Sequence, residues 1–317
     1  MKEILLHAPA TTANVGPGYD IFALTLQNPN DEIRLQLNNF NKVTIELSGE
    51  DSDIPVNVND NTAGLAVLEF LKRKNISQGV HIQIIKKMPS GCGLGTTGAS
   101  AAACVFGLNK LLELNLPKNE LIDIARLGEV ASGGSPHADN VAAALLGGFI
   151  LVKSYNPVDV LKLDMPEFPI VLAVMRKSQR TTRGFITYDI GEEKLKEQIA
   201  HCSSVINAIH TKDIEEFGKA ITTDYVAEPI RGAAIPNYFE TKKAILRAGA
   251  YGCNISGGGS SVFAVCDEKK QDEIAEIMKK SFSSNPNFIC LVKTKMSNEG
   301  IREILKNAPF QYTCSQD

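Results

Sequence analysis

Residues 88–112 read MPSGCGLGTTGASAAACVFGLNKLL, in which glycines and hydroxyl residues precede an alanine-rich stretch. The glycines are Gly91, Gly93, Gly95 and Gly98, and the hydroxyl residues among and after them are Thr96, Thr97 and Ser100. Glycines let a ligand approach the main-chain N–H groups closely, because they carry no side chain. A helix that starts here adds unpaired N–H groups and a partial positive charge, and the hydroxyls can bond phosphate oxygens or a phosphate-bound Mg²⁺. The segment therefore predicts a phosphate-binding loop.

The same composition has a plainer interpretation, and it excludes two common nucleotide motifs. The glycines could form only a tight turn, and the alanines could serve only to let helices pack closely. No lysine follows the loop as G-x-x-x-x-G-K-[ST] requires, and Thr96 interrupts G-x-G-x-x-G. A dehydrogenase would need the dinucleotide pattern and is excluded, whereas phosphate binding and a structural turn both stay open.

Hydrophobic periodicity elsewhere predicts helices that alternate with strands, as in an α/β or α+β chain. Strands are predicted at residues 3–10, 31–37, 42–48, 79–89, 169–176 and 287–295, and two strands around a second glycine loop at 252–266. Helices are predicted at residues 61–75, 117–132, 192–210, 214–225, 238–249 and 269–282. The first glycine loop thus joins a strand to a helix, and Asn61 and Thr62 suit a helix N-cap.

Length and composition limit the class of protein. The 317 residues suit two domains or one large one, and 44% apolar with 22% charged residues is typical of a folded globular chain. The net charge of -3 and the scattered basic residues argue against nucleic acid as a partner. The longest apolar stretch, Val141–Val152, is too short for a membrane span, and no signal peptide is recognisable, so we expect a cytoplasmic protein.

Two further expectations concern the cysteines and the domain boundary. The seven cysteines are widely scattered, with no C-x-x-C pair and no metal-like spacing with histidines, so we expect reduced and mostly buried thiols. Residues 154–169 contain three prolines and are predicted to be a connection. The boundary within 152–164 divides the chain into domains 1–155, with the glycine loop, and 156–317.

Three motifs in order resemble those of the GHMP kinases, which phosphorylate small molecules such as galactose, homoserine and mevalonate. PSGCGLGTTGASAAA resembles the family's second motif, APATTANVGPGYD at 8–20 its first, and NISGGGSSVFAV at 254–265 its third. GEVASGGSPHADNVAAALLGG and EPIRGAAIPNY are similar to segments of the homoserine kinase branch. The resemblance implies a two-domain α+β fold, with an N-terminal ribosomal S5 domain 2-like α/β domain containing a left-handed β-α-β unit and a C-terminal ferredoxin-like α+β domain.

The resemblance also implies a reaction. ATP would phosphorylate the side-chain hydroxyl of L-homoserine directly, with Mg²⁺, to give O-phosphohomoserine for threonine biosynthesis. The ATP-binding residues would be Pro89, Ser90, Gly91, Gly93, Leu94, Gly95, Thr96, Thr97, Gly98, Ala99 and Ser100, with Asn61 and Thr62 at the adenine. Glu129 and Thr97 match the family's metal positions, although a helical carboxylate is more often a solvated surface charge.

The acceptor site is implied residue by residue. Arg183 and Arg231 match the carboxylate-binding arginines, whose planar fork suits a bidentate contact. The residues for the amino and hydroxyl groups would be Asn14, Asp20, His137 and Asn140. The two arginines could instead be surface ion-pair residues, Asp20 a turn or helix-start residue and His137 a packed loop histidine. No residue is marked as a dedicated base, and Asp139 or Asp20 is the weak candidate.

One departure keeps alternatives open. Gln179 stands where homoserine kinases commonly have a threonine that helps hold the substrate hydroxyl. A GHMP kinase for another small hydroxy acid, of the mevalonate, shikimate or pantoate type, is therefore the second hypothesis. A non-catalytic nucleotide-binding paralogue is the third, and the retained Glu129 and loop threonines argue against it. The expected partners are ATP, the small-molecule acceptor and a second copy in a homodimer.

Overall fold

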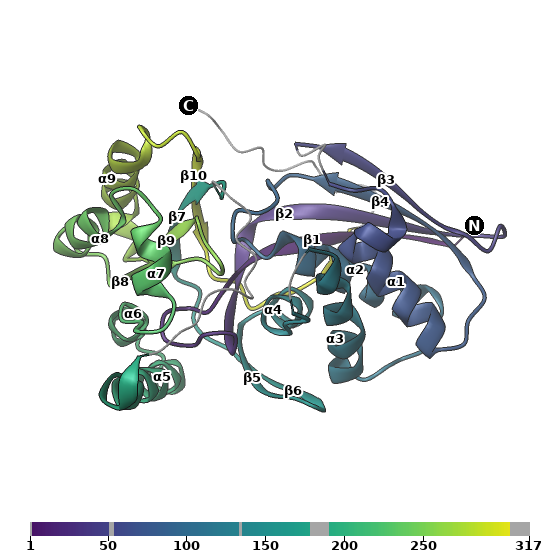
Figure 1. Cartoon of the computed structure of the whole chain (residues 1–317), viewed down its shortest axis with the longest axis horizontal. Helices are drawn as coiled ribbons and strands as arrows, with labels where there is room; N and C mark the ends of the chain where they lie inside the picture. The colour runs from purple at the N-terminus through teal and green to yellow at the C-terminus, as the bar shows by residue number, and fades with distance from the viewer. Residues whose placement is uncertain (1, 51–53, 133–134, 178–189, 305–317) are drawn as a thin grey trace.

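The computed structural model describes residues 2–50, 54–132, 135–177 and 190–304, and Figure 1 shows two halves, each with its own sheet and helices. The strands are β1 (Glu3–Ala13), β2 (Phe22–Asn38), β3 (Val43–Gly49), β4 (Gly79–Lys86), β5 (Phe149–Tyr155), β6 (Val158–Leu163), β7 (Pro169–Met175), β8 (Gly252–Ile255), β9 (Val262–Val265), β10 (Phe288–Lys295) and β11 (Arg302–Glu303). The helices are α1 (Thr62–Arg73), α2 (Thr96–Leu111), α3 (Lys118–Arg126), α4 (Asp139–Leu146), α5 (Gly191–Thr211), α6 (Ile214–Ile221), α7 (Glu228–Ala233), α8 (Tyr238–Arg247) and α9 (Gln271–Phe282). Short 3-10 helices are η1 (Val58–Asp60), η2 (Leu127–Ser132) and η4 (Glu268–Lys270).

The first sheet has seven strands, with β11-β1-β2-β4-β3 in order and β5 and β6 continuing from β2. β3 and β4 run parallel and are joined through α1, which forms a β-α-β unit, while β1, β2 and β4 pair antiparallel. Helices α1–α4 cover one face of this sheet (Figure 1). The alternation in β4 explains the layering, because Val80, Ile82 and Ile84 enter the core beneath these helices and the residues between them are only half buried.

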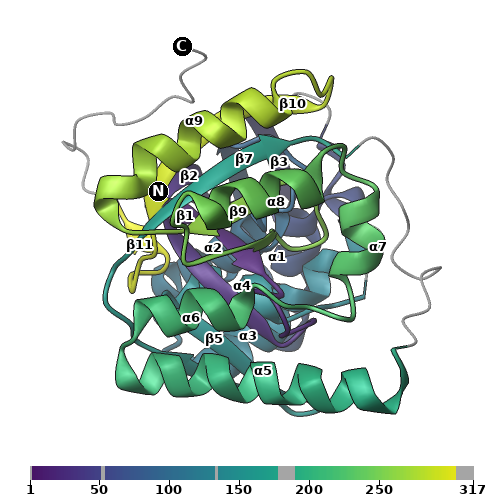
Figure 2. The same cartoon turned by 90° about the vertical axis from the view of Figure 1, so that its left-hand side faces the viewer.

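The second sheet has the order β10-β7-β9-β8 and is antiparallel throughout. Counting its strands along the chain gives a β-α-β-β-α-β unit with strand order 4-1-3-2, the ferredoxin-like arrangement. Figure 2 shows α8 and α9 over this sheet and α5 and α6 running beside each other along the lower edge. The α+β fold expected from the sequence is therefore confirmed.

A shared apolar core joins the two halves. Leu172 and Val174 of β7 point to one side, where they pack with Phe22 of the first sheet and Phe217 of α6. The intervening residues of β7 point to the other side, toward α8 and α9. Because both faces are buried, PIVLAVM reads as an unbroken apolar run rather than as an alternating one. Leu94 of the glycine loop belongs to the same joint core, which fixes the loop between the halves.

Three local predictions needed correction. The interpretation of residues 154–169 as a connection is wrong, because β6 lies there and pairs with β5, and the prolines stand outside that strand. The first sheet thus continues beyond residue 155, and the division into 1–155 and 156–317 stays a prediction.

The helix predicted over 117–132 ends at Arg126 and continues as η2. The strand predicted at 31–37 begins at Phe22, since the residues from Phe22 to Leu26 alternate between the two cores.

The cysteine prediction holds for part of the described chain. Cys92, Cys104, Cys202, Cys253 and Cys266 are free thiols, and four of the five are buried. Burial raises the pKa of the Cys202 thiol to about 11. Cys290 is disulfide-bonded, so the expectation of a reduced thiol is wrong at that position. In the part of the chain that the structure describes, no helix combines the length and the apolar character needed to span a membrane.

Candidate active site

The glycine loop between β4 and α2 is held by its carbonyl groups. The carbonyl oxygen of Leu94 accepts a hydrogen bond from the Thr11 N–H at 3.0 Å. That of Gly93 accepts one from the Ser256 hydroxyl at 2.7 Å, and that of Cys92 accepts one from the Ser261 N–H at 3.3 Å. These donors come from the first and the third sequence motif, so all three motifs meet at this loop.

The N–H groups of the loop are arranged differently from its carbonyls. Gly91, Gly93 and Gly95 have φ angles of 71°, 81° and 61°. Within the described residues, the N–H groups of Gly93, Gly95, Thr96 and Thr97 donate to no protein acceptor. Left-handed residues that alternate with ordinary ones point successive N–H groups into a concave nest that suits an anion, and the start of α2 adds its dipole. The loop is a tight turn whose geometry also suits an anion, so its two interpretations are compatible and phosphate binding stays a prediction.

Gly95 is required by its surroundings. A Cβ atom added there would lie 1.9 Å from Thr11 Oγ1 and 2.5 Å from Asn140 Oδ1. Those two side chains bond each other, with the Thr11 hydroxyl donating to Asn140 Oδ1 at 2.7 Å. Asn140 therefore lies against the start of α2, and Thr11, which sequence reasoning did not select although it stands within the first motif, fixes it there.

The starts of α1 and α2 lie together. Asn61 is the N-cap of α1, since its Oδ1 accepts the N–H groups of Ala63 at 2.9 Å and Gly64 at 3.3 Å. This confirms the N-cap interpretation of Asn61. The Thr62 hydroxyl donates to the Thr97 carbonyl at 3.3 Å and so joins the two helix starts.

Glu129 approaches the same place from η2. A Cβ added at its neighbour Gly128 would lie 2.3 Å from the Thr62 carbonyl, so η2 lies directly against the start of α1. Glu129 is half buried there. The described residues hold no cluster of three or more His, Cys, Asp or Glu side chains that could enclose a metal ion. One carboxylate and the Thr97 hydroxyl fit Mg²⁺ that is coordinated mainly by phosphate oxygens and water, the arrangement this small ion prefers.

The turn at residues 14–20 presents the next candidate group. Asn14 has a φ of 68°, and its Oδ1 accepts the Asp20 N–H at 3.1 Å. His137 Nδ1 lies 3.7 Å from Asp20 Oδ1. The Tyr155 hydroxyl donates to the Asp20 carbonyl at 2.6 Å. Burial, with the Asp139 charge as a smaller cause, raises the pKa of Tyr155, which keeps it a hydrogen-bond donor.

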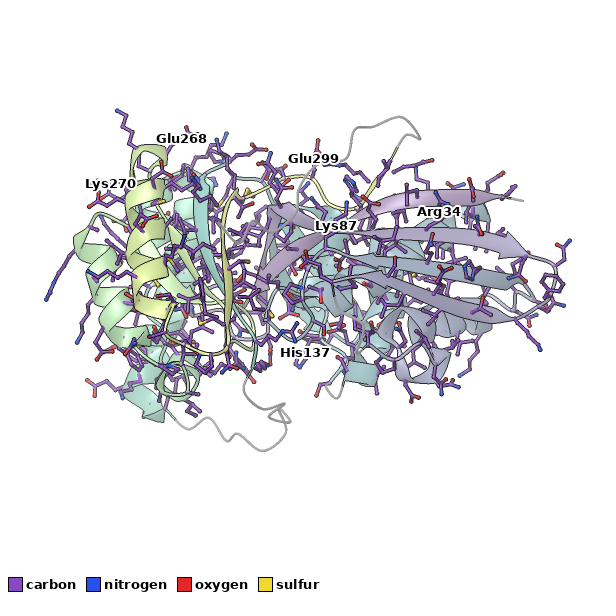
Figure 3. All side chains as sticks on the ribbon, turned by 90° about the horizontal axis from the view of Figure 1, so that it is seen from above. Arg34, Lys87, His137, Glu268, Lys270 and Glu299 are labelled. Atoms are coloured by element: carbon purple, nitrogen blue, oxygen red, sulfur yellow. The ribbon has the colours of Figure 1, made fainter. Side chains whose placement is uncertain are left out.

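Tyr155 is a residue that sequence reasoning missed, because it lies in the hairpin that was predicted to be a connection. Figure 3 shows His137 where the two halves of the molecule meet. Asp139 is only 2% exposed, and its Oδ1 accepts the Asn140 N–H at 2.7 Å. Asp20 is half buried and faces His137, so of the two weak base candidates Asp20 is the more accessible.

Arg231 on α7 completes the described group. Its NH1 donates to the Gly257 carbonyl at 2.7 Å, and its guanidinium carbon lies 5.5 Å from the centre of the Tyr19 ring. Gly257 is adjacent to Gly93, because a Cβ at Gly257 would lie 3.1 Å from the Gly93 carbonyl oxygen. Arg231 therefore stands next to both the turn 14–20 and the glycine loop. Arg183 and Gln179 lie outside the described residues.

A buried ion pair fixes the backbone immediately before the glycine loop. Lys86 at the end of β4 forms an ion pair with Asp31, and both side chains are almost fully buried. Asp31 Oδ1 also accepts the N–H groups of Lys87 at 2.8 Å and Met88 at 3.1 Å. These bonds hold the backbone that leads into Pro89, and Figure 3 shows Lys87 near the junction of the halves.

Sequence comparisons place both halves of the chain in one family. Residues 61–148 match the model of the GHMP kinases N terminal domain, and residues 205–284 match that of the GHMP kinases C terminal domain. A protein named homoserine kinase from Methanococcus maripaludis is 37% identical over 281 residues, which cover 88% of this chain and 93% of that protein. The chain belongs to the GHMP kinases, in the homoserine kinase family.

Further relatives support this membership. A homoserine kinase of Chlorobium phaeobacteroides is 32% identical over 299 residues, covering 90% of this chain and 93% of the relative. The crystal structure of homoserine kinase from Cytophaga hutchinsonii superposes with a TM-score of 0.88 at 34% identity, covering 96% of this chain and 98% of that one. The family resemblance that was drawn from the three motifs is thus confirmed over nearly the whole chain.

Proposed function

We propose that this chain transfers the γ-phosphoryl group of ATP to the side-chain hydroxyl of L-homoserine, giving O-phosphohomoserine for threonine biosynthesis. The observation that carries the proposal is that Asn14 and Arg231 both bond the carbonyl of Gly257, which lies against the glycine loop. Asn14 also bonds the Asp20 N–H, and Asp20 faces His137. The homoserine kinases at 32% to 37% identity over most of the chain support the choice of acceptor.

The donor side follows from the loop. The N–H groups of Gly93, Gly95 and the first turn of α2 would bind the phosphates of ATP, and the adenine would lie near Asn61 and Thr62 at the start of α1. Thr97 and Glu129 would hold Mg²⁺, which when bound neutralises charge on the phosphate oxygens. Phosphoryl transfer depends mainly on positioning and charge neutralisation, so the absence of a marked base does not weaken the proposal.

The acceptor side follows from the turn 14–20 and α7. Arg231, together with Arg183, would bind the homoserine carboxylate, for which a planar guanidinium is well suited. Asn14, Asp20, His137 and Asn140 would contact the amino group and the hydroxyl. Asp20 would be the group that accepts the hydroxyl proton if any side chain does. A homodimer and a cytoplasmic location stay predictions.

The test is an ADP-release assay with MgATP and separate acceptors: L-homoserine, mevalonate, shikimate, pantoate and none. Turnover confined to homoserine supports the proposal and shows that Gln179 is tolerated in the hydroxyl site. Turnover with another acceptor alone would replace the substrate while keeping the donor site. Binding of ATP without any turnover would favour a non-catalytic paralogue.

A further inference from the structure

Gln198 is an unusual residue on α5. The first ten residues of this helix, 191–200, are exposed except for Gln198, whose exposure is 5%. Burial of a side-chain amide is unfavourable unless its hydrogen-bonding groups are satisfied. Gln198 Nε2 donates to the Pro17 carbonyl at 2.7 Å and to Asp224 Oδ1 at 2.9 Å, and Oε1 accepts the Tyr225 N–H at 2.8 Å. Both ends of the amide are therefore engaged, and both of its N–H donors reach other segments.

Asp224, one of these partners, controls the start of α7. It is 5% exposed and precedes the helix by a short turn. Its Oδ1 accepts the Val226 N–H at 2.8 Å, and its Oδ2 accepts the Glu228 N–H at 3.0 Å. A carboxylate at these N–H groups fixes the direction in which the helix leaves the turn. Since α7 carries Arg231, Asp224 fixes the base from which that guanidinium extends.

Pro17, the other partner, belongs to the turn 14–20 that carries Asn14 and Asp20. The Cys202 thiol also donates to the Pro17 carbonyl, at 3.3 Å. The backbone of this turn packs closely on the end of α6, because a Cβ at Gly16 would lie 2.3 Å from the Ile221 carbonyl oxygen. The turn therefore rests on the same part of the second half that leads into Asp224.

We propose that Gln198 and Asp224 are positioning residues for the acceptor site, which hold the turn 14–20 at a fixed distance from Arg231. The Gln198 amide bonds both elements that would bind opposite ends of the acceptor, and this link adds to the one through the Gly257 carbonyl that Asn14 and Arg231 share. The glycine loop is held by other contacts, through Thr11, Ser256 and Ser261. Loss of the bridge therefore weakens binding of the acceptor and leaves binding of ATP nearly unchanged. This inference rests on the proposed function of the same site.

The decisive variant is Gln198→Glu, which keeps the shape and the acceptor for the Tyr225 N–H but replaces the donating amide with a carboxylate beside Asp224. We expect the KM for homoserine to rise about tenfold, since a buried group loses its donor and faces a like charge. The KM for ATP and kcat should stay within about threefold of the wild-type values. The double variant Gln198→Glu with Asp224→Asn removes the like charge, but the Pro17 carbonyl still lacks its amide donor, so the KM for homoserine should recover only in part.

Val205→Ala is the matched control, because Val205 is fully buried on the same helix but belongs to the apolar core. This variant should lower Tm but should not raise the KM for homoserine relative to the KM for ATP. The inference would be overturned if Gln198→Glu changed the KM for homoserine and the KM for ATP equally. It would also be overturned if Val205→Ala raised the KM for homoserine as selectively as Gln198→Glu does.

A second measurement is independent of activity. Amide hydrogen exchange should show that Gln198→Glu lowers protection of the Asp20 and Glu228 N–H groups together, because these lie on the two elements that Gln198 joins. Unchanged protection at both sites contradicts the positioning role. If the wild-type protein uses another acceptor, the proposed function fails, and the same KM comparison with that acceptor still tests the inference.

Discussion

Asn14 and Arg231 donate hydrogen bonds to the same atom, the carbonyl oxygen of Gly257, at 2.9 Å and 2.7 Å. One residue comes from the first motif, one from α7 and the acceptor from the loop of the third motif, which also touches Gly93. The shared carbonyl sets the spacing between the residues proposed for the acceptor and the loop proposed for ATP.

Replacing Arg231 should affect the acceptor alone. Arg231→Lys keeps the charge but removes the planar fork, so we expect the KM for homoserine to rise by about tenfold or more, with a much smaller change for ATP. Steady-state kinetics with each substrate varied in turn measures the difference. Arg247→Lys at the exposed end of α8 is the control and should change neither value. If Arg231→Lys kept the wild-type KM for homoserine, Arg231 would not be a residue of the acceptor site.

Two loop glycines should differ sharply when each is replaced by alanine. Both Gly91 and Gly95 have positive φ, so either substitution costs roughly 1–2 kcal/mol of backbone strain. A Cβ at Gly95 also overlaps Thr11, whereas one at Gly91 meets no atom of the described residues within 4 Å. Gly95→Ala should therefore be the less stable variant and should lose ATP binding, as measured by urea unfolding and by ATP titration. Equal effects of the two variants would contradict the packing at Gly95.

Glu129 should control the requirement for Mg²⁺. Glu129→Gln removes the carboxylate charge at nearly constant shape, so we expect the Mg²⁺ concentration for half-maximal rate to rise at least about tenfold. Chelation with EDTA should abolish turnover of the wild-type enzyme. Glu113→Gln, which changes an exposed carboxylate just beyond the end of α2 that lies opposite the glycine loop, should leave the Mg²⁺ dependence unchanged. If Glu129→Gln had the same Mg²⁺ dependence as the wild type, Glu129 would not be a metal ligand.

His7 should contribute to the pH dependence of stability. Burial, followed by the Arg302 charge, lowers its pKa from the ordinary value of 6.5, and its Nδ1 has no hydrogen-bond partner in the described residues. The unfolded chain therefore binds the proton more readily. The stabilisation is fully present above about pH 6.5 and is lost as the pH falls from there toward the lowered value.

The measurement is urea unfolding of the wild type and of His7→Gln at pH 7.5 and pH 5.5. The variant should lose less unfolding free energy on acidification than the wild type does. An identical loss in both proteins would show that His7 does not titrate differently in the folded state.

The glycine loop, its position between a strand and a helix, and the family could all be predicted from the sequence. These features depend on local composition and on contiguous motifs. Asn61 as an N-cap was likewise readable from its place before an amphipathic helix. The burial of Gln198 could not be predicted, because the local sequence of an exposed helix does not show which polar residue tertiary packing will bury. Strand β6, and Tyr155 at the end of β5 opposite it, were missed because flanking prolines outweighed a short alternation of apolar residues. The site is built from contacts between distant segments, and such contacts leave little local signal.

In the proposed reaction the phosphoryl group passes from ATP to the side-chain oxygen of homoserine. The most direct test is ³¹P NMR of a reaction containing the protein, MgATP and L-homoserine. We expect the γ-phosphate signal of ATP to be replaced, one for one, by the signal of a phosphate monoester coupled to the terminal CH₂ protons of homoserine. Release of inorganic phosphate with homoserine unchanged, or no loss of the γ-phosphate signal, would contradict it.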